Sequence, residues 1–241
     1  MVQIFVPCFI DQLFPNTAVN MVKLLQEAGC DLDYNPNQTC CGQPAFNAGY
    51  WQEAQGVAEK FVKDLSKIKA PIVCPSSSCV GYARNFMSDL TFEDTKTQVA
   101  YERIQTSIFE LSEYLVDHLQ VVEFGAQLKA KAVYHDACAA LRECKIKAAP
   151  RKLLENVKGL ELLELPESDQ CCGFGGTFAV KFEPISVAMA EKKVNHALSV
   201  GAEYMISADL SCLMHMQGYI ENKKLPLKVL HLADLLMMKG E

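Results

Sequence analysis

Eight of the eleven cysteines in this 241-residue chain fall into two sets with matching spacing. In the first set, Cys8 is followed 32 positions later by the run Cys40-Cys41-Gly42, and Cys79 comes last. The second set repeats the order with a first interval of 33 positions, and it consists of Cys138, Cys171, Cys172, Gly173 and Cys212. A cubane [4Fe–4S] cluster takes four thiolates, one on each iron. The spacing therefore predicts two [4Fe–4S] clusters, one for each set.

Glycines follow both cysteine pairs. Gly42 and Gly173 can adopt positive φ, which lets the backbone approach a cluster and donate N–H groups to its sulfides. The second loop extends this freedom through Gly175 and Gly176. We predict that these four glycines line the cofactor sites. Cys79 and Cys212 each lie at an expected helix start, where the helix dipole favours a thiolate.

Three cysteines lie outside the two sets, and the spacing can also be compared with that of zinc sites and disulfide frameworks. Cys30, Cys74 and Cys144 stand outside the sets and are interpreted as buried structural cysteines. A zinc-stabilised interaction module is an alternative, but structural zinc usually shows short Cys-x2-Cys or Cys-x4-Cys pairs, and only Cys74 and Cys79 have such spacing. The odd number of cysteines argues against a complete disulfide framework.

Composition excludes several classes of function. The net charge is −6 and no basic stripe is visible, so nucleic-acid binding is not expected. No apolar run approaches the ~18 residues of a membrane span, so direct membrane insertion is not expected either. The segment Met1–Pro7 lacks the basic region of a secretory signal, and we expect a cytoplasmic protein that meets protein partners.

The elements that must position the thiols alternate between strand and helix, which predicts an α/β fold of small, mainly parallel sheets flanked by helices. Strands are expected at 3–7, 31–34 and 71–74, and again at 131–135, 160–165 and 203–207. Helices are expected between Asn16 and Gly29, over 54–65, from Cys79, over 104–119, over 151–157, over 187–198 and from Cys212. Residues 230–238 resemble 109–116, each with an apolar helical stripe. The order repeats, so we predict two pseudo-symmetric repeats, 1–120 and 121–241.

The motifs match a known family. The chain resembles the CCG cysteine-rich proteins, which include the cysteine-rich component of heterodisulfide reductase, the iron–sulfur component of glycolate oxidase and, most similar, the lactate utilization protein A family. The resemblance spans nearly the whole chain, and its second Cys-Cys-Gly motif with the tail Gly-Gly-Thr-Phe is specific. The matching segments are Pro7-Cys8, Cys40–Pro44, Tyr134–Cys138, Cys171–Phe178 and Ser211–His215.

This resemblance implies an iron–sulfur electron-transfer subunit of an L-lactate oxidation complex. Such a protein acts with other subunits of the complex, without NAD, rather than as a stand-alone enzyme. The fuller family pattern ends in Cys-x2-Cys and holds noncubane clusters with five cysteines. In this chain Ser76 and Asp209 take the place of the first cysteine of that pair. Cys74, two residues before Ser76, is the alternative for the missing thiol in the first repeat, although its position on the strand points it differently. The departure favours electron-carrying clusters over the alternative, a thiol/disulfide oxidoreductase of the heterodisulfide reductase type.

Catalytic residues are not identified, because no nucleophile elbow, Walker loop or dinucleotide fingerprint is present. Three further side chains stand near the cysteine motifs. His135 is interpreted as a polar strand end, with hydrogen bonding to a cluster as the alternative. His215 lies on the expected helix face of Cys212 and could donate to the same site, whereas Lys181 is interpreted as a solvated surface lysine.

Overall fold

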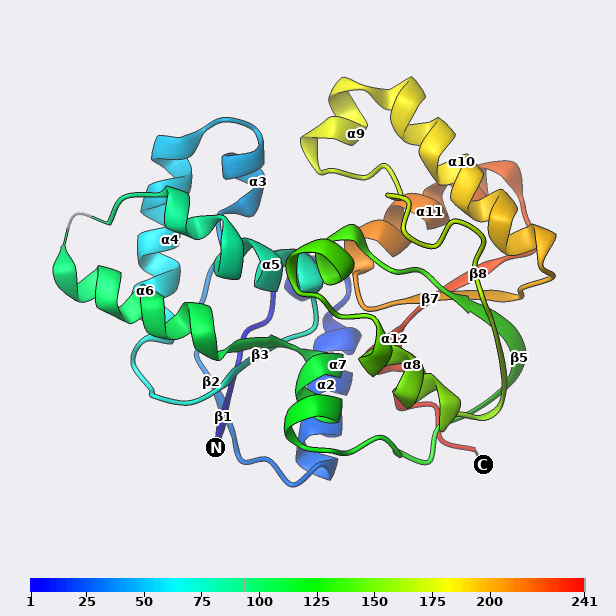
Figure 1. Ribbon diagram of the computed structural model, residues 1–241, viewed down its shortest axis with the longest axis horizontal. Helices are drawn as coiled ribbons and strands as arrows, with labels where there is room; N and C mark the ends of the chain where they lie inside the picture. Colours follow the sequence, from blue (N-terminus) through cyan, green and yellow to red (C-terminus); the bar gives the residue numbers. More distant parts are fainter. Residues whose placement is uncertain (93, 241) are drawn as a thin grey trace.

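Two four-stranded parallel sheets, each flanked by helices, make up the chain in a computed structural model that describes residues 1–92 and 94–240 (Figure 1). The sheets have the strand orders β2-β1-β3-β4 and β6-β5-β7-β8, so the two halves share one topology. The predicted α/β class with two similar halves is confirmed.

The first half contains the strands β1 (Val2–Ile4), β2 (Leu32–Tyr34), β3 (Ile72–Cys74) and β4 (Ile108–Glu110). Its helices are α1 (Cys8–Leu13), α2 (Pro15–Glu27), α3 (Gln43–Asn47), α4 (Trp51–Leu65), α5 (Ser77–Asn85), α6 (Thr95–Ser107) and α7 (Leu111–Glu113), with short turns η1 (Met87–Asp89) and η2 (Tyr114–His118).

The second half contains the strands β5 (Gln127–Tyr134), β6 (Lys158–Leu163), β7 (Tyr204–Ser207) and β8 (Lys228–His231). Its helical segments are η3 (Ala139–Glu143), α8 (Ala148–Glu155), α9 (Thr177–Lys181), α10 (Glu183–Ser199), α11 (Leu210–Lys223) and α12 (Leu232–Leu236).

The central strands β1 and β3 are buried, as are most of β7 and the last three residues of β5, as expected for parallel sheets covered on both faces. β1 pairs with β2 and β3, and β5 pairs with β6 and β7, in the same parallel arrangement. Ile72 and Val73 in β3, and Met205 and Ile206 in β7, are fully buried. The two central pairs therefore hold the strand ends, and the cysteines that follow them, in equivalent positions.

The long helix predicted over 104–119 is wrong. The helix α6 ends at Ser107, the chain forms the strand β4, and a new helix starts at Leu111. The spacing of Ile108 and Leu111 suits a helix, but Ile108 and Phe109 also favour a strand, and burial against β3 decides between them. The Glu110 carboxylate accepts from Ser112 N at 2.8 Å and begins a capping box, which restarts the helix. Residues 230–238 follow the same plan, because β8 precedes α12.

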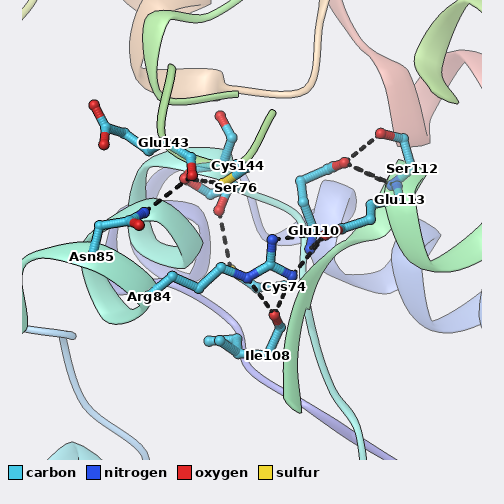
Figure 2. A network of polar contacts seen from close by, with 11 residues as sticks. Cys74, Ser76, Arg84, Asn85, Ile108, Glu110, Ser112, Glu113, Glu143 and Cys144 are labelled. Carbon is cyan, nitrogen blue, oxygen red and sulfur yellow. Dashed lines mark hydrogen bonds and ion pairs between the residues drawn. The ribbon is translucent and has the colours of Figure 1, made fainter. Parts of the chain in front are cut away.

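The two halves meet where α5 packs against η3, and Figure 2 shows the contact of Asn85 with Glu143 at this junction. Arg84 of α5 donates to Ile108 O at 2.9 Å and pairs with Glu113 at 2.8 Å. From the same helix, Asn85 donates to Glu143 O of the second half at 3.1 Å. A Cβ at Gly81 would lie 2.7 Å from Glu143 Cβ, so only glycine allows this close approach.

A second connection joins the C-terminal helix to the first half. The Asp234 carboxylate of α12 accepts from Thr17 Oγ1 and Asn20 Nδ2 of α2, each at 2.8 Å. Lys239 also pairs with Glu27, the last residue of α2, at 2.7 Å. The second half thus covers one face of a helix that belongs to the first.

Across the part of the chain that the structure describes, every helix is too short or too polar to cross a membrane.

Candidate metal centres

Each thiol set gathers at the carboxyl ends of three neighbouring strands. Cys8 begins α1 after β1, the pair Cys40 and Cys41 lies between β2 and α3, and Cys79 is the third residue of α5 after β3. Parallel strands end at one edge of their sheet, so loops that follow adjacent strands meet there. The second set has the same places relative to β5, β6 and β7.

In the first set the thiols form a continuous row of hydrogen bonds, Cys8–Cys40–Cys41–Cys79. Donation from the Cys41 and Cys8 thiols lowers the pKa of Cys40 to about 3. Gly42 N also donates to Cys40 Sγ at 3.4 Å. The same interaction with Cys40 raises the pKa of the fully buried Cys41. Cys40 is therefore the thiolate around which the other thiols gather.

The second set repeats this row as Cys138–Cys171–Cys172–Cys212. Hydrogen bonds from Cys138 and Cys172 lower the pKa of Cys171 to about 2, and Gly173 N donates to Cys171 Sγ at 3.4 Å. A hydrogen bond with Cys172 lowers the pKa of Cys212 to about 7. The structure thus brings together all four cysteines of each set, and their binding of clusters stays a prediction.

Each set also has a fifth polar neighbour. The buried Cys74 thiol lies against Cys79, in contact with the first row, although it was interpreted as a structural cysteine outside the site. The fully buried His135 approaches the second row, where its ring nitrogen and the sulfurs of Cys172 and Cys212 all lie within 4.8 Å of one another. Apart from the Cys212 thiol, the described residues include no hydrogen-bond partner for the ring nitrogens of His135.

Among the four predicted glycines, two contact the thiols directly. Gly42 has φ +98° and Gly173 has φ +92°, and each N–H reaches the first sulfur of its cysteine pair. A Cβ on Gly42 would lie 3.2 Å from Ala54 O. Gly175 and Gly176 also have positive φ and shape the turn into α9, and the described contacts include no hydrogen bond from either to a sulfur.

Replacing Gly173 with alanine is expected to lower the free energy of unfolding by about 3 kcal/mol, because it combines backbone strain with a steric clash. The new Cβ would lie 2.7 Å from Ser186 O and 2.8 Å from Met189 Cβ. Gly29→Ala is the matched control, since Gly29 has φ +82° with no atom within 4 Å of the added Cβ, and it should cost about 1 kcal/mol. Urea unfolding followed by circular dichroism measures both. Equal losses would show that the close packing at Gly173 contributes nothing.

Ser76 and Asp209, the positions that hold cysteine in five-cysteine relatives, join the two halves instead. Asp209 Oδ2 accepts from Ser77 Oγ at 3.1 Å, from Ser78 N at 3.0 Å and from Ser78 Oγ at 2.5 Å. Ser76 Oγ donates to the same oxygen at 3.4 Å. A carboxylate of the second half therefore caps the start of α5 in the first half. The family pattern, which has cysteine at this position, does not predict this role.

A surface hollow of about 450 Å³ opens beside Cys171. Its lining includes the cationic side chains of Arg142 and Lys192 and the apolar side chains of Ile185 and Met189. Next to it, Val180 and Phe182 expose their side chains near the start of α10. The second thiol set is thus reached from solvent through a surface that is partly apolar.

The remaining side chains noted in the sequence support the second Cys-Cys-Gly loop or lie outside it. His215 Nε2 lies 3.0 Å from Ser186 Oγ, and that hydroxyl donates to Gly173 O at 2.8 Å. His215 therefore acts on the loop backbone through Ser186, one step removed from the sulfurs. Lys181 is exposed on α9.

The donor set fits an iron–sulfur cluster. Sulfur atoms alone make up the first row, one thiol in each set has a strongly lowered pKa, and backbone N–H groups point to these thiolates. Soft thiolate donors suit iron–sulfur clusters and zinc, and backbone donors compensate the negative charge of a bound cluster. The residues present thus suit metal or iron–sulfur binding.

Comparisons with known proteins agree with this geometry. A family model described as a cysteine-rich domain matches residues 2–82 and again 132–217, one match in each half. Lactate utilization protein A of Geobacillus sp. (strain WCH70) is 40% identical over 239 residues, which cover 98% of both chains. Lactate utilization protein A of Exiguobacterium sp. (strain ATCC BAA-1283 / AT1b) is 42% identical over 236 residues, covering 98% of this chain and 96% of the relative.

A crystal structure of a hypothetical protein from Helicobacter pylori superposes with a TM-score of 0.65 at 13% identity. The match covers 100% of this chain and 49% of that one, and at this identity it shows a shared fold alone. The family follows from the matches in sequence, which extend over nearly the full length of both chains. The chain belongs to the lactate utilization protein A family of cysteine-rich-domain proteins.

Proposed function

We propose that this protein is the iron–sulfur electron-transfer subunit of a complex that oxidises L-lactate. One observation carries the proposal: two rows of four cysteines converge at equivalent places in two similar halves. A bound [4Fe–4S] cluster supplies one-electron transfer, and two of them form a relay. The substrate and the complex come from the names of the relatives, which are lactate utilization proteins.

The residues of the chain hold and insulate these sites. Cys8 is exposed and Cys138 is half-buried, whereas Cys41 and Cys172 are almost fully buried. Each row therefore runs from the surface into the core. The buried thiols exclude water from one side of the site, and the outer thiols remain near solvent, where a redox partner can approach.

Partner subunits have a surface to meet at the second site. The hollow beside Cys171 brings solvent to its sulfur, and the apolar side chains around it resemble the core of a protein interface. A surface of this kind suits the passage of electrons to a partner subunit, with lactate oxidised elsewhere in the complex.

The experiment that tests the function is chemical analysis of protein purified without oxygen. We expect about eight irons and eight sulfides per chain, a brown colour, and an electron paramagnetic resonance signal after reduction with dithionite. When the protein is purified together with partner subunits from the same source, added lactate should reduce the clusters and produce the same paramagnetic signal without dithionite. Stoichiometric zinc without sulfide, in a colourless protein, would instead support a zinc-stabilised module and reject the proposal.

A further inference from the structure

The two halves differ in the side chains that lie behind their thiol sets. Phe5 and His135 hold equivalent positions, each three residues before the first cysteine of its set. Phe61 and Lys193 are also equivalent, because each follows the sequence Ala-Glu-Lys in the helix after its Cys-Cys-Gly loop. All four side chains are at most 1% exposed. The repeat therefore has two aromatic rings in one half and two nitrogen-bearing side chains in the other.

Behind the first set the two rings belong to the hydrophobic core, and the buried donor near this set is the Tyr82 hydroxyl beside Gly42. Phe5 and Phe61 form an edge-to-face pair with ring centroids 5.0 Å apart. A phenyl ring carries no net charge and no N–H donor. The first site consequently has an apolar wall at this place.

Behind the second set, Lys193 is a buried cation. Its Nζ donates to Glu167 O at 2.8 Å and to Ser168 O at 2.9 Å, and these neutral carbonyls hold the ammonium in place. No carboxylate of the described residues lies within ion-pair distance of Nζ. The groups that act on its charge are, from the largest, the carboxylates of Asp136 and Asp169 and then the sulfurs of Cys172 and Cys171. In a region of low dielectric constant this attraction is weakly screened.

His135 adds a donor to the same site. Its ring lies within 4.8 Å of the sulfurs of Cys172 and Cys212, and its two nitrogens have no other partner among the described residues. A neutral imidazole carries one N–H, and a buried N–H that lacks a partner costs free energy. Donation to a thiolate or sulfide removes that cost, so the site itself supplies the missing acceptor.

We propose that these two side chains give the second site a higher reduction potential than the first, so that electrons pass from the first half to the second. This inference rests on the proposed function. Reduction adds one negative charge to a cluster, and a nearby cation or an N–H donor stabilises that charge. One electron leaves the first site as the same electron enters the second. No bond is broken and no proton moves.

Nearby carboxylates also act on the two sites, and their effects must be compared with that of Lys193. Asp136 lies close to Lys193, but Arg151 neutralises it through two hydrogen bonds of 2.8 Å. The Asp209 carboxylate acts on Cys138 and Cys212 and opposes the effect of the cation, while hydrogen bonds from the serines that begin α5 stabilise its charge. Glu110 belongs to the first half and has no cationic partner, so whenever it is ionised it lowers the potential of the first site and increases the difference.

The test is a redox titration of anaerobically purified protein, followed by electron paramagnetic resonance. We expect two clusters with separate midpoint potentials. Cys41→Ser, which removes a buried thiol of the first set, should leave only the cluster of higher potential. Lys193→Met, which removes the charge at similar length, should shift the higher potential to a more negative value and leave the lower potential unchanged.

Lys193→Arg is the matched control, because it keeps the charge and should keep the higher potential near its original value. Two equal potentials, or a shift of only the lower one in Lys193→Met, would overturn the inference while leaving the proposed function intact. If Lys193→Met fails to retain its second cluster, the comparison of the unaltered protein with Cys41→Ser still decides which site has the higher potential. A protein without iron and sulfide would reject the proposed function itself.

Discussion

A Cys172→Ser variant purified without oxygen is expected to contain about half of the iron and sulfide of the unaltered protein, because one of two four-iron sites is lost. Cys172 is only 3% exposed and contacts both Cys171 and Cys212 in the centre of its row. A serine hydroxyl there is a hard, weakly acidic donor that replaces a soft thiolate, so it does not hold iron in a cluster of this kind. Iron and sulfide analysis, with visible absorbance as a second measure, gives the result directly.

Two further variants serve as controls for this experiment. Cys30→Ser lies outside both rows and should keep all the iron. Cys74→Ser should also keep it, because the four thiols of the first row suffice for a cubane. If Cys74→Ser loses the first cluster, five thiols bind there, as in proteins of the heterodisulfide reductase type. Full iron in Cys172→Ser would show that the row is not the cluster site.

Asp209→Ala is expected to lower the free energy of unfolding by about 3 kcal/mol, an unusually large effect for one polar side chain. The substitution removes the acceptor shared by Ser77 and Ser78 and leaves the first N–H groups of α5 without their cap. The gain from no longer burying a carboxylate offsets part of this loss. Urea unfolding under anaerobic conditions, followed by circular dichroism, measures the change.

Asp209→Asn provides the comparison, since it keeps an oxygen at nearly the same place while removing the charge. We expect it to lose about 1 kcal/mol, because one neutral acceptor still serves α5. A loss below about 1 kcal/mol in Asp209→Ala would contradict the role of this carboxylate at the junction of the halves.

The repeated cysteine spacing was sufficient to predict the two halves and the meeting of each thiol set. Sequence positions after adjacent parallel strands must end at one edge of a sheet, so Cys8, Cys41 and Cys79 could be placed together without coordinates. The fourth strand of each sheet was missed. Ile108–Glu110 and Lys228–His231 are short, and their apolar spacing suits either a strand or a helix.

Side-chain roles at the sites were harder to predict, because they depend on which way a buried residue points. Cys74 is the last residue of β3, and its place on the strand predicted a side chain that points away from the other thiols, but its sulfur lies against Cys79. Lys193 stands in the charged run Glu191-Lys192-Lys193 and belongs to no cysteine motif. A residue-by-residue comparison of the two repeats would have singled it out, since Phe61 stands at the equivalent position.

The exchange of contacts between the halves has a consequence for either half expressed alone. Asp209 caps a helix of the first half, and Asp234 of the second half satisfies Thr17 and Asn20 on another helix there. A gene fragment that encoded either half alone would produce a polypeptide with uncapped polar groups and an uncovered helix face. The two halves are therefore expected to be stable only together, even though each has its own sheet and its own set of thiols.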